Sequence, residues 1–221
     1  MAICLIVYVT VVAIRCLDYP KWDHDSLRVD GEYIMATHDT YTWLAGAKGL
    51  GYNLHTPLAK LVKAIHQFTG AKLGMIGFWL PPLAASLVAV AIVLWAWTLG
   101  GLQAGLLAGP LGALCLAFFH RTRMGYLDTD LATLLAPLFL AWGLAHWLGR
   151  YISPDWTPFL RFFRPKETQR EASSPSAAEA LPLPRPTDWL WMIGLGYAAW
   201  YFGTWHGYIQ AYVRGAILLS M

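Results

Sequence analysis

"MIGFWLPPLAASLVAVAIVLWAWTL", residues 75–99, is an uncharged stretch long enough to cross a lipid bilayer as one helix. An α-helix rises about 1.5 Å per residue, so roughly 20 apolar residues span the hydrocarbon core of a membrane. Gly100 and Gly101 follow and allow a tight turn into another apolar stretch. We therefore predict an all-α fold, a polytopic transmembrane helical bundle. Its expected spans lie at about 1–17, 75–99, 101–119, 131–148 and 189–204, with a sixth starting at about 209–221.

The composition agrees with a membrane protein. Hydrophobic residues make up 57% of the chain and charged residues 13%, whereas soluble domains carry about 25% charged residues. Twelve tryptophans and eleven tyrosines suit the two membrane–water interfaces. The net charge of +3 is spread along the chain without a basic patch, so no nucleic acid partner is expected. None of the three cysteines forms a Cys-x-x-Cys pair, so neither a thiolate metal site nor a disulfide framework is indicated.

Two longer polar segments connect the expected spans. Residues 18–74 form a first external loop, in which Thr56 and Pro57 predict the start of a helix with the apolar stripe Leu58, Leu61, Val62, Ile65 and Phe68. Residues 153–188 are rich in Pro, Ser, Ala and charge, which predicts a flexible linker. Basic residues just beyond the fourth span favour a cytoplasmic side for this linker. The first loop carries six basic residues of its own, so charge bias alone leaves the orientation open.

Both ends of the sequence have the appearance of a cut. Only about 14 residues precede Arg15 in the first apolar run, fewer than the roughly 20 of a full span. A cleaved signal peptide is less favoured because a basic lead is missing. The last residues, "RGAILLSM", stop inside an apolar run. We expect the chain to be the N-terminal piece of a larger protein.

Charged residues gather in "RTRMGYLDTD", residues 121–130, between two expected spans. If successive spans alternate in direction, this turn lies on the same side as the first loop, which holds Asp39, and as "GTWHGY" at 203–208. Three carboxylates and an arginine at one membrane surface suggest a hard-cation site facing a diphosphate. Residues i and i+2 of a continuous helix point about 200° apart. Asp128 and Asp130 can therefore face one ion only if Asp128 precedes the helix and the helix starts near Thr129.

A purely structural interpretation explains the same residues. Asp128 could cap the next helix, Asp130 could interact with the helix dipole, and Arg121 and Arg123 could extend from the membrane to the interface. On this interpretation Asp39 is an ordinary loop residue, and the aromatic residues near 205 belong to the interfacial belt. The residues alone leave both interpretations open.

Three segments in order resemble motifs of one enzyme family, the catalytic subunit of oligosaccharyltransferase, in particular its bacterial single-subunit form. They are "THDTYTWLAGAKGLG" at 37–51, "HRTRMGYLDTD" at 120–130 and "TWHGYI" at 204–209. The third departs from the family pattern, because His206 stands where the family has the first of two glycines. The resemblance covers nearly the whole chain except the linker. It implies the N-terminal part of a GT-C-like glycosyltransferase membrane domain, multi-pass in the bacterial inner membrane, with its active face periplasmic or external.

The resemblance also implies a reaction and its residues. A glycan passes, with inversion, from a polyprenyl diphosphate carrier (a lipid-linked oligosaccharide) to asparagine in Asn-x-Ser/Thr of an acceptor protein or peptide. The implied site uses Mg²⁺ or Mn²⁺ bound by Asp39, Asp128 and Asp130, with Asp39 also engaging the acceptor amide. Arg121 is implied as a further site residue. The implied substrate-binding residues are Trp205 and Tyr208.

Two further features of the family are absent from the 221 residues. A glutamate on a later external loop and a Trp-Trp-Asp motif in a soluble C-terminal domain have no counterpart here. We therefore expect half a site, and no transfer to an acceptor peptide by this chain alone. Another polyprenyl-phosphate-sugar-dependent membrane glycosyltransferase is the alternative enzyme. A transporter whose intramembrane charges line a pathway is less favoured, because the charges cluster at one interface rather than at mid-membrane.

Overall fold

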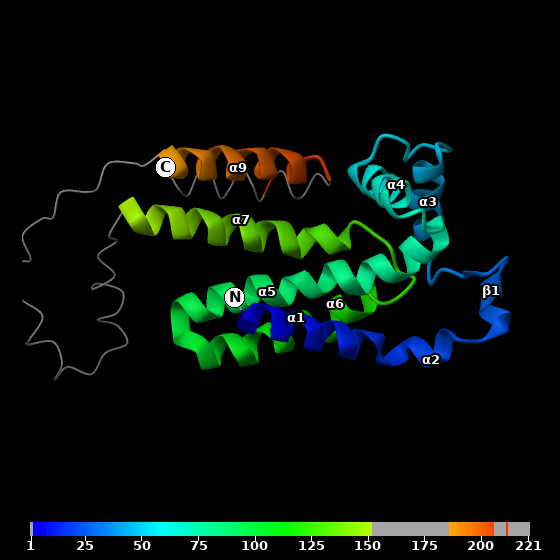
Figure 1. Cartoon of the computed structure of the whole chain (residues 1–221), viewed down its shortest axis with the longest axis horizontal. Helices are drawn as coiled ribbons and strands as arrows, with labels where there is room; N and C mark the ends of the chain where they lie inside the picture. The colour runs from blue at the N-terminus through cyan, green and yellow to red at the C-terminus, as the bar shows by residue number, and fades with distance from the viewer. Residues whose placement is uncertain (1, 152–185, 206–210, 212–221) are drawn as a thin grey trace, which may run out of the picture.

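The computed structural model describes residues 2–151, 186–205 and 211, which are mostly helical (Figure 1). Two short strands in the first loop add a small antiparallel hairpin to the predicted all-α fold. The longer helices are α1 (Ala2–Arg15), α3 (His38–Lys48), α4 (Pro57–Thr69), α5 (Leu73–Ala113), α7 (Asp130–Tyr151) and α9 (Pro186–Gly203). The shorter elements are η1 (Cys16–Asp18), α2 (Tyr19–Trp22), η2 (Asp25–Leu27), β1 (Arg28–Val29), β2 (Glu32–Tyr33) and α6 (Leu116–Arg121).

Two helical stretches in the described residues are long and apolar enough to cross a membrane. They are Ala2–Trp22, which runs from α1 through η1 into α2, and Leu73–Ala113, which is α5. A shorter apolar stretch, Asp130–His146, lies in α7. The first helical stretch therefore continues several residues beyond the predicted end at 17.

Helix α5 consists of two antiparallel arms joined at Gly101. This glycine has φ 79° and ψ −173°, which interrupts the helix, and the second arm returns beside the first (Figure 1). The arms pack closely because Gly109 has no side chain: a Cβ there would lie 2.6 Å from Cγ2 of Val93 and 3.1 Å from the carbonyl oxygen of Ala89. The predicted stretches 75–99 and 101–119 correspond to these two arms, the second ending in the separate helix α6.

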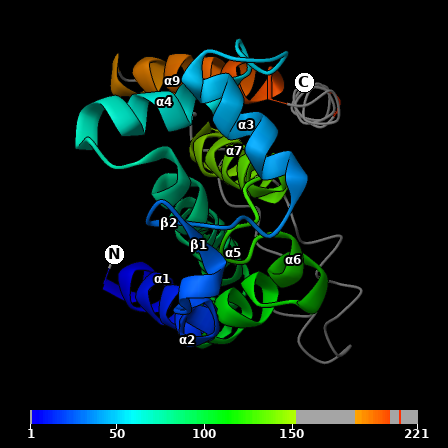
Figure 2. The same ribbon diagram turned by 90° about the vertical axis from the view of Figure 1, so that its right-hand side faces the viewer.

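The first loop is folded against one end of the long helices, as Figure 2 shows. Helix α4 begins at Pro57 as predicted, but the hydroxyl of Thr56 donates to the carbonyl oxygen of Asn53 (2.7 Å) and does not cap the helix. Leu58 and Val62 are buried, whereas Phe68 is 93% exposed. The buried residues lie in the first two turns of α4, so the rest of the structure does not cover the last residue of the apolar stripe.

The later part of the chain differs from prediction at one boundary. Helix α9 begins at Pro186, so the last three residues of the predicted linker 153–188 are helical. Residues 152–185 and nearly all of the predicted sixth span lie outside the described residues. Helix α9 packs along α7, where the indole N–H of Trp191 lies 3.5 Å from the carbonyl oxygen of Gly143 (Figure 1).

Candidate active site

Helix α3 presents Asp39 in its first turn. Thr37 is the N-cap residue, and its hydroxyl oxygen accepts from the backbone N–H of Thr40 at 3.4 Å. The side chain of Asp39 is 50% exposed, and its Oδ1 lies 3.1 Å from Nε2 of His38. A carboxylate near a helix N-terminus interacts favourably with the helix dipole. The local sequence therefore holds the Asp39 carboxylate at a solvent-accessible helix end.

Thr40 joins the start of α3 to the segment that precedes α7. Its buried hydroxyl lies 3.2 Å from the carbonyl oxygens of both Gly125 and Leu127, and it accepts from the backbone N–H of Leu127 at 3.0 Å. A backbone hydrogen bond from Ala36 to Gly125 (2.9 Å) lies beside it. Asp39 precedes Thr40, and Asp128 follows Leu127, so each aspartate is next to this junction.

Gly125 is required at this junction. Its φ of 72° is strained for other residues, and a Cβ there would lie 3.2 Å from the backbone nitrogen of Ala36. The sequence analysis missed the positioning function of Thr40 and Gly125. The signal was present, since Gly125 belongs to "RTRMGYLDTD" and Thr40 follows Asp39, but only the tertiary structure places them together.

The predicted break before α7 is confirmed. The helix begins at Asp130, Asp128 lies outside it, and both carboxylates face Arg121 at the end of α6. Nε of Arg121 donates to Oδ2 of Asp130 at 2.6 Å, and Nη2 lies 3.6 Å from Oδ2 of Asp128. The other oxygen of Asp128 accepts from the backbone N–H of Thr129 at 2.6 Å. Asp128 therefore lies before the first turn of α7, where it accepts from the backbone N–H of Thr129 and faces the guanidinium of Arg121.

The carboxylates of Asp128 and Asp130 stabilise the positive charge of Arg121. The hydrogen bond and the negative charge of Asp130 raise the pKa of Arg121 above its ordinary value, so its guanidinium stays protonated at all physiological pH. The Asp128 side chain is 14% exposed, Asp130 30% and Arg121 57%. The two carboxylates are therefore partly sheltered while the guanidinium reaches solvent. Arg123, also exposed, makes no ion pair among the described residues.

Trp205 lies at the same end of the bundle. Its side chain packs against Ala132 and Ala136 in the first turns of α7, and its ring meets that of Tyr201 edge-on at 6.2 Å between centroids. This contact brings the C-terminal end of α9 beside the helix that Asp130 begins (Figure 1). Tyr208, the other predicted substrate-binding residue, lies outside the described residues.

The carboxylates have the right chemistry for a hard divalent cation, which prefers oxygen ligands. Within residues 2–151, 186–205 and 211, however, no group of three or more His, Cys, Asp or Glu side chains is arranged to hold one metal ion. Asp128 and Asp130 converge on Arg121, and Asp39, in the first turn of α3, belongs to no such group. The structure therefore brings together two of the three predicted ligands.

A buried arginine behind the site was missed by the sequence analysis, which placed it only at the end of the first span. Arg15 is 1% exposed and donates through Nη1 to Oγ1 (2.8 Å) and the carbonyl oxygen (3.2 Å) of Thr122, and through Nη2 to the carbonyl oxygen of Ala113 (2.6 Å). Thr122 follows Arg121 directly. Arg15 therefore binds the backbone that carries Arg121.

Replacing Thr40 with valine tests the junction. Valine has nearly the same shape, but it leaves the N–H of Leu127 without its acceptor in a buried place, which costs about 1–3 kcal/mol. We expect the unfolding free energy, measured by denaturant titration in mixed micelles, to fall by that amount. Thr98→Val is the matched control, because the Thr98 hydroxyl is exposed and donates to the carbonyl oxygen of Leu94 in its own helix. Equal losses in the two variants would contradict the junction.

Comparison with known proteins identifies the family that this chain matches. Residues 53–218 match the sequence model of the family described as oligosaccharyl transferase STT3, N-terminal, and this range includes Arg121, Asp128, Asp130 and Trp205 but begins after Asp39. Two curated relatives are named undecaprenyl-diphosphooligosaccharide–protein glycotransferase. The one from Campylobacter jejuni subsp. jejuni serotype O:2 is 23% identical, and the one from C. jejuni strain RM1221 is 22% identical, each over 148 residues.

Each alignment covers 62% of this chain and 21% of the relative. The chain therefore spans about a fifth of the length of the curated relatives it matches. The match to the family model covers most of the chain and includes the second and third of the three sequence segments, whereas the first, 37–51, lies before it. It confirms the resemblance to this family. The chain belongs to the oligosaccharyl transferase STT3 family, whose N-terminal region it matches.

Proposed function

We propose that this chain forms the N-terminal membrane part of a glycosyltransferase that moves an oligosaccharide from a polyprenyl diphosphate carrier to asparagine in Asn-x-Ser/Thr. The observation that carries the proposal is the group of Arg121, Asp128 and Asp130, held beside the start of α3 by Thr40. The name of the C. jejuni relatives, undecaprenyl-diphosphooligosaccharide–protein glycotransferase, supports it. We place the protein in a bacterial inner membrane, with this end facing outward.

Arg121 is the proposed contact to the diphosphate. Its contacts to Asp130 through Nε and to Asp128 through Nη2 orient the planar guanidinium, and more than half of the side chain remains exposed. Guanidinium groups bind phosphate oxygens through paired, charge-assisted hydrogen bonds.

An open cavity beside this pair suits the apolar part of the carrier. It has a volume of about 430 Å³, and Phe118, Leu134 and Cys115 line it together with Arg121 and Asp130. An isoprenoid chain in this cavity would place its diphosphate at the guanidinium. The presence of the Arg121 cation in the wall of this apolar cavity thus supports a lipid-linked donor rather than a soluble nucleotide sugar.

Asp39, Asp128 and Asp130 are the proposed ligands of Mg²⁺ or Mn²⁺. When bound, such an ion would neutralise charge on the departing diphosphate. Asp39, half-exposed at its helix end, is also the proposed acceptor of a hydrogen bond from the asparagine side-chain N–H. That contact would orient an amide nitrogen that is otherwise a poor nucleophile, because its lone pair is delocalised into the carbonyl group.

A transfer assay tests the proposal on the full gene product that carries this chain. We expect a glycan from undecaprenyl-diphosphate-linked oligosaccharide to appear on a labelled Asn-x-Thr peptide, and not on a matched Gln-x-Thr peptide. Chelation with EDTA should stop transfer, and added Mn²⁺ or Mg²⁺ should restore it. Movement of the lipid-linked glycan across vesicles without any glycopeptide would overturn the proposal in favour of a transporter.

A further inference from the structure

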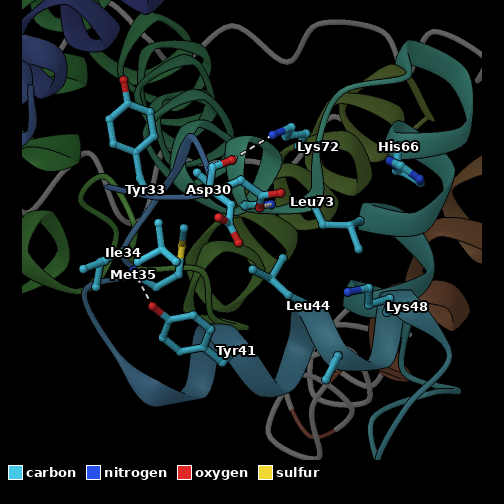
Figure 3. Close-up of a pocket in the computed structure, with 14 residues that line it drawn as sticks. Asp30, Tyr33, Ile34, Met35, Tyr41, Leu44, Lys48, His66, Lys72 and Leu73 are labelled. Carbon is cyan, nitrogen blue, oxygen red and sulfur yellow. Dashed lines mark hydrogen bonds between the residues drawn. The ribbon is translucent and has the colours of Figure 1, made fainter. Parts of the chain in front are cut away.

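A second cavity lies in the folded first loop, lined by none of the residues assigned above to the active site. It has a volume of about 560 Å³ and is enclosed by the β1–β2 hairpin, α3, the end of α4 and the start of α5 (Figure 3). One face of α3 lines it, because Tyr41, Leu44, Ala45 and Lys48 follow the spacing of helical neighbours. The floor is apolar, and the rim is charged.

Some of the charged groups around this cavity are occupied in holding its walls together. Oε2 of Glu32 accepts from the backbone N–H of Gly74 at the start of α5 (2.8 Å), and Nζ of Lys72 donates to the backbone carbonyl of Asp30 (2.9 Å). Nδ1 of His66 lies 2.7 Å from the carbonyl oxygen of Ala71. The first two contacts join the hairpin to the start of α5, and the third joins the end of α4 to the segment before α5.

Two opposite charges on the same cavity remain available. Within the part of the chain that the structure describes, neither the Asp30 carboxylate nor the Lys48 ammonium has a hydrogen bond or an ion pair. They come from the hairpin turn and from the end of α3, and the fold holds them too far apart to form an ion pair with each other. A ligand complementary to this cavity therefore carries a positive and a negative group close together in one small polar part.

The surroundings indicate a lipid. Leu73 and Gly74 in the cavity wall are the first residues of α5, a helix long and apolar enough to cross a membrane. Val29, which lines the cavity, is 62% exposed. An exposed apolar side chain beside a charged cavity suits acyl chains below a polar headgroup.

We propose that this cavity binds the headgroup of phosphatidylethanolamine. The primary ammonium donates hydrogen bonds to the Asp30 carboxylate, and the phosphate accepts from the ammonium group of Lys48. Phosphatidylcholine fits less well, because its quaternary ammonium has no N–H to donate. Phosphatidylglycerol leaves Asp30 without a cation. The proposal goes beyond the glycan transfer proposed above and does not depend on it.

Lipid retention measured by native mass spectrometry tests this assignment. The chain is extracted from membranes containing equal amounts of phosphatidylethanolamine and phosphatidylcholine. We expect phosphatidylethanolamine to be retained preferentially, by up to about fivefold, the range of a single exposed ion pair. Asp30→Asn should remove the preference, and Lys48→Gln should weaken retention of both lipids. Asparagine accepts the positive φ of residue 30 (51°), so the hairpin turn is kept.

Matched controls are available in the same loop. Asp25→Asn and Lys63→Gln change exposed charges that do not line the cavity, and both should retain phosphatidylethanolamine as the unchanged chain does. Equal retention of the two lipids by the unchanged chain would overturn the proposal, as would equal preference in Asp30→Asn and Asp25→Asn. Because no glycan transfer is measured, this result is separate from the transfer assay.

Discussion

Replacing Asp128 with asparagine is expected to reduce glycan transfer by about 100-fold or more while leaving the helices folded. Removing one preorganised charged group from a catalytic site typically has an effect of this order. The asparagine oxygen can still accept from the N–H of Thr129, so the turn before α7 keeps its hydrogen bond. The variant loses the negative charge that faces Nη2 of Arg121 at 3.6 Å. The rate of transfer to an Asn-x-Thr peptide, measured across a range of Mn²⁺ concentrations, is the readout.

The control for this variant is Asp25→Asn, which removes an exposed carboxylate from the first loop far from α7 in the sequence and should transfer at the normal rate. Arg121→Gln should weaken binding of the lipid-linked donor, whereas Arg123→Gln, an exposed arginine in the same decapeptide, should leave it unchanged. Normal transfer by Asp128→Asn at every metal concentration would show that the carboxylate is structural, as an ordinary turn residue would be.

Replacing Arg15 with methionine is expected to lower the unfolding free energy by about 2–4 kcal/mol, because hydrogen bonds to charged groups contribute more than neutral ones and buried acceptors are left unpaired. The guanidinium binds Thr122 and the carbonyl oxygen of Ala113, the last residue of α5, and it lies over the ring of Phe118 at 5.2 Å. Methionine fills much of the volume but donates no hydrogen bond. Denaturant titration in mixed micelles measures the loss.

Two companion variants make the result specific. Arg15→Lys should recover part of the stability, since a single ammonium can reach fewer of the acceptors. Arg123→Met alters an exposed arginine and should change the unfolding free energy by less than about 0.5 kcal/mol. If Arg15→Met were as stable as the unchanged chain, the hydrogen bonds that join α1 to the ends of α5 and α6 would not stabilise the fold.

The sequence by itself determined the helical framework and part of the site. Long apolar runs, the break at Gly101, the start of α4 at Pro57 and the separation of Asp128 from the helix that begins at Asp130 all follow from local chemistry. Helix rise and periodicity act over a few residues, so a single sequence contains enough information to predict them. The two aspartates could face Arg121 together only through a break in the helix, and the structure has that break.

Only the tertiary structure decided which distant residues meet. Thr40 reaches the backbone of residues 125–127 across more than 80 positions, and Arg15 reaches Thr122 across more than 100. The exposure of Phe68 likewise depends on how far the elements packed against α4 extend along it, and the apolar pattern of the helix does not predict this. Hydrogen bonds between segments so far apart form only after the helices have packed, so no local pattern of residues predicts them. Asp39 and Asp128 lie next to the junction between α3 and the segment before α7, because the buried hydroxyl of Thr40 joins these two segments.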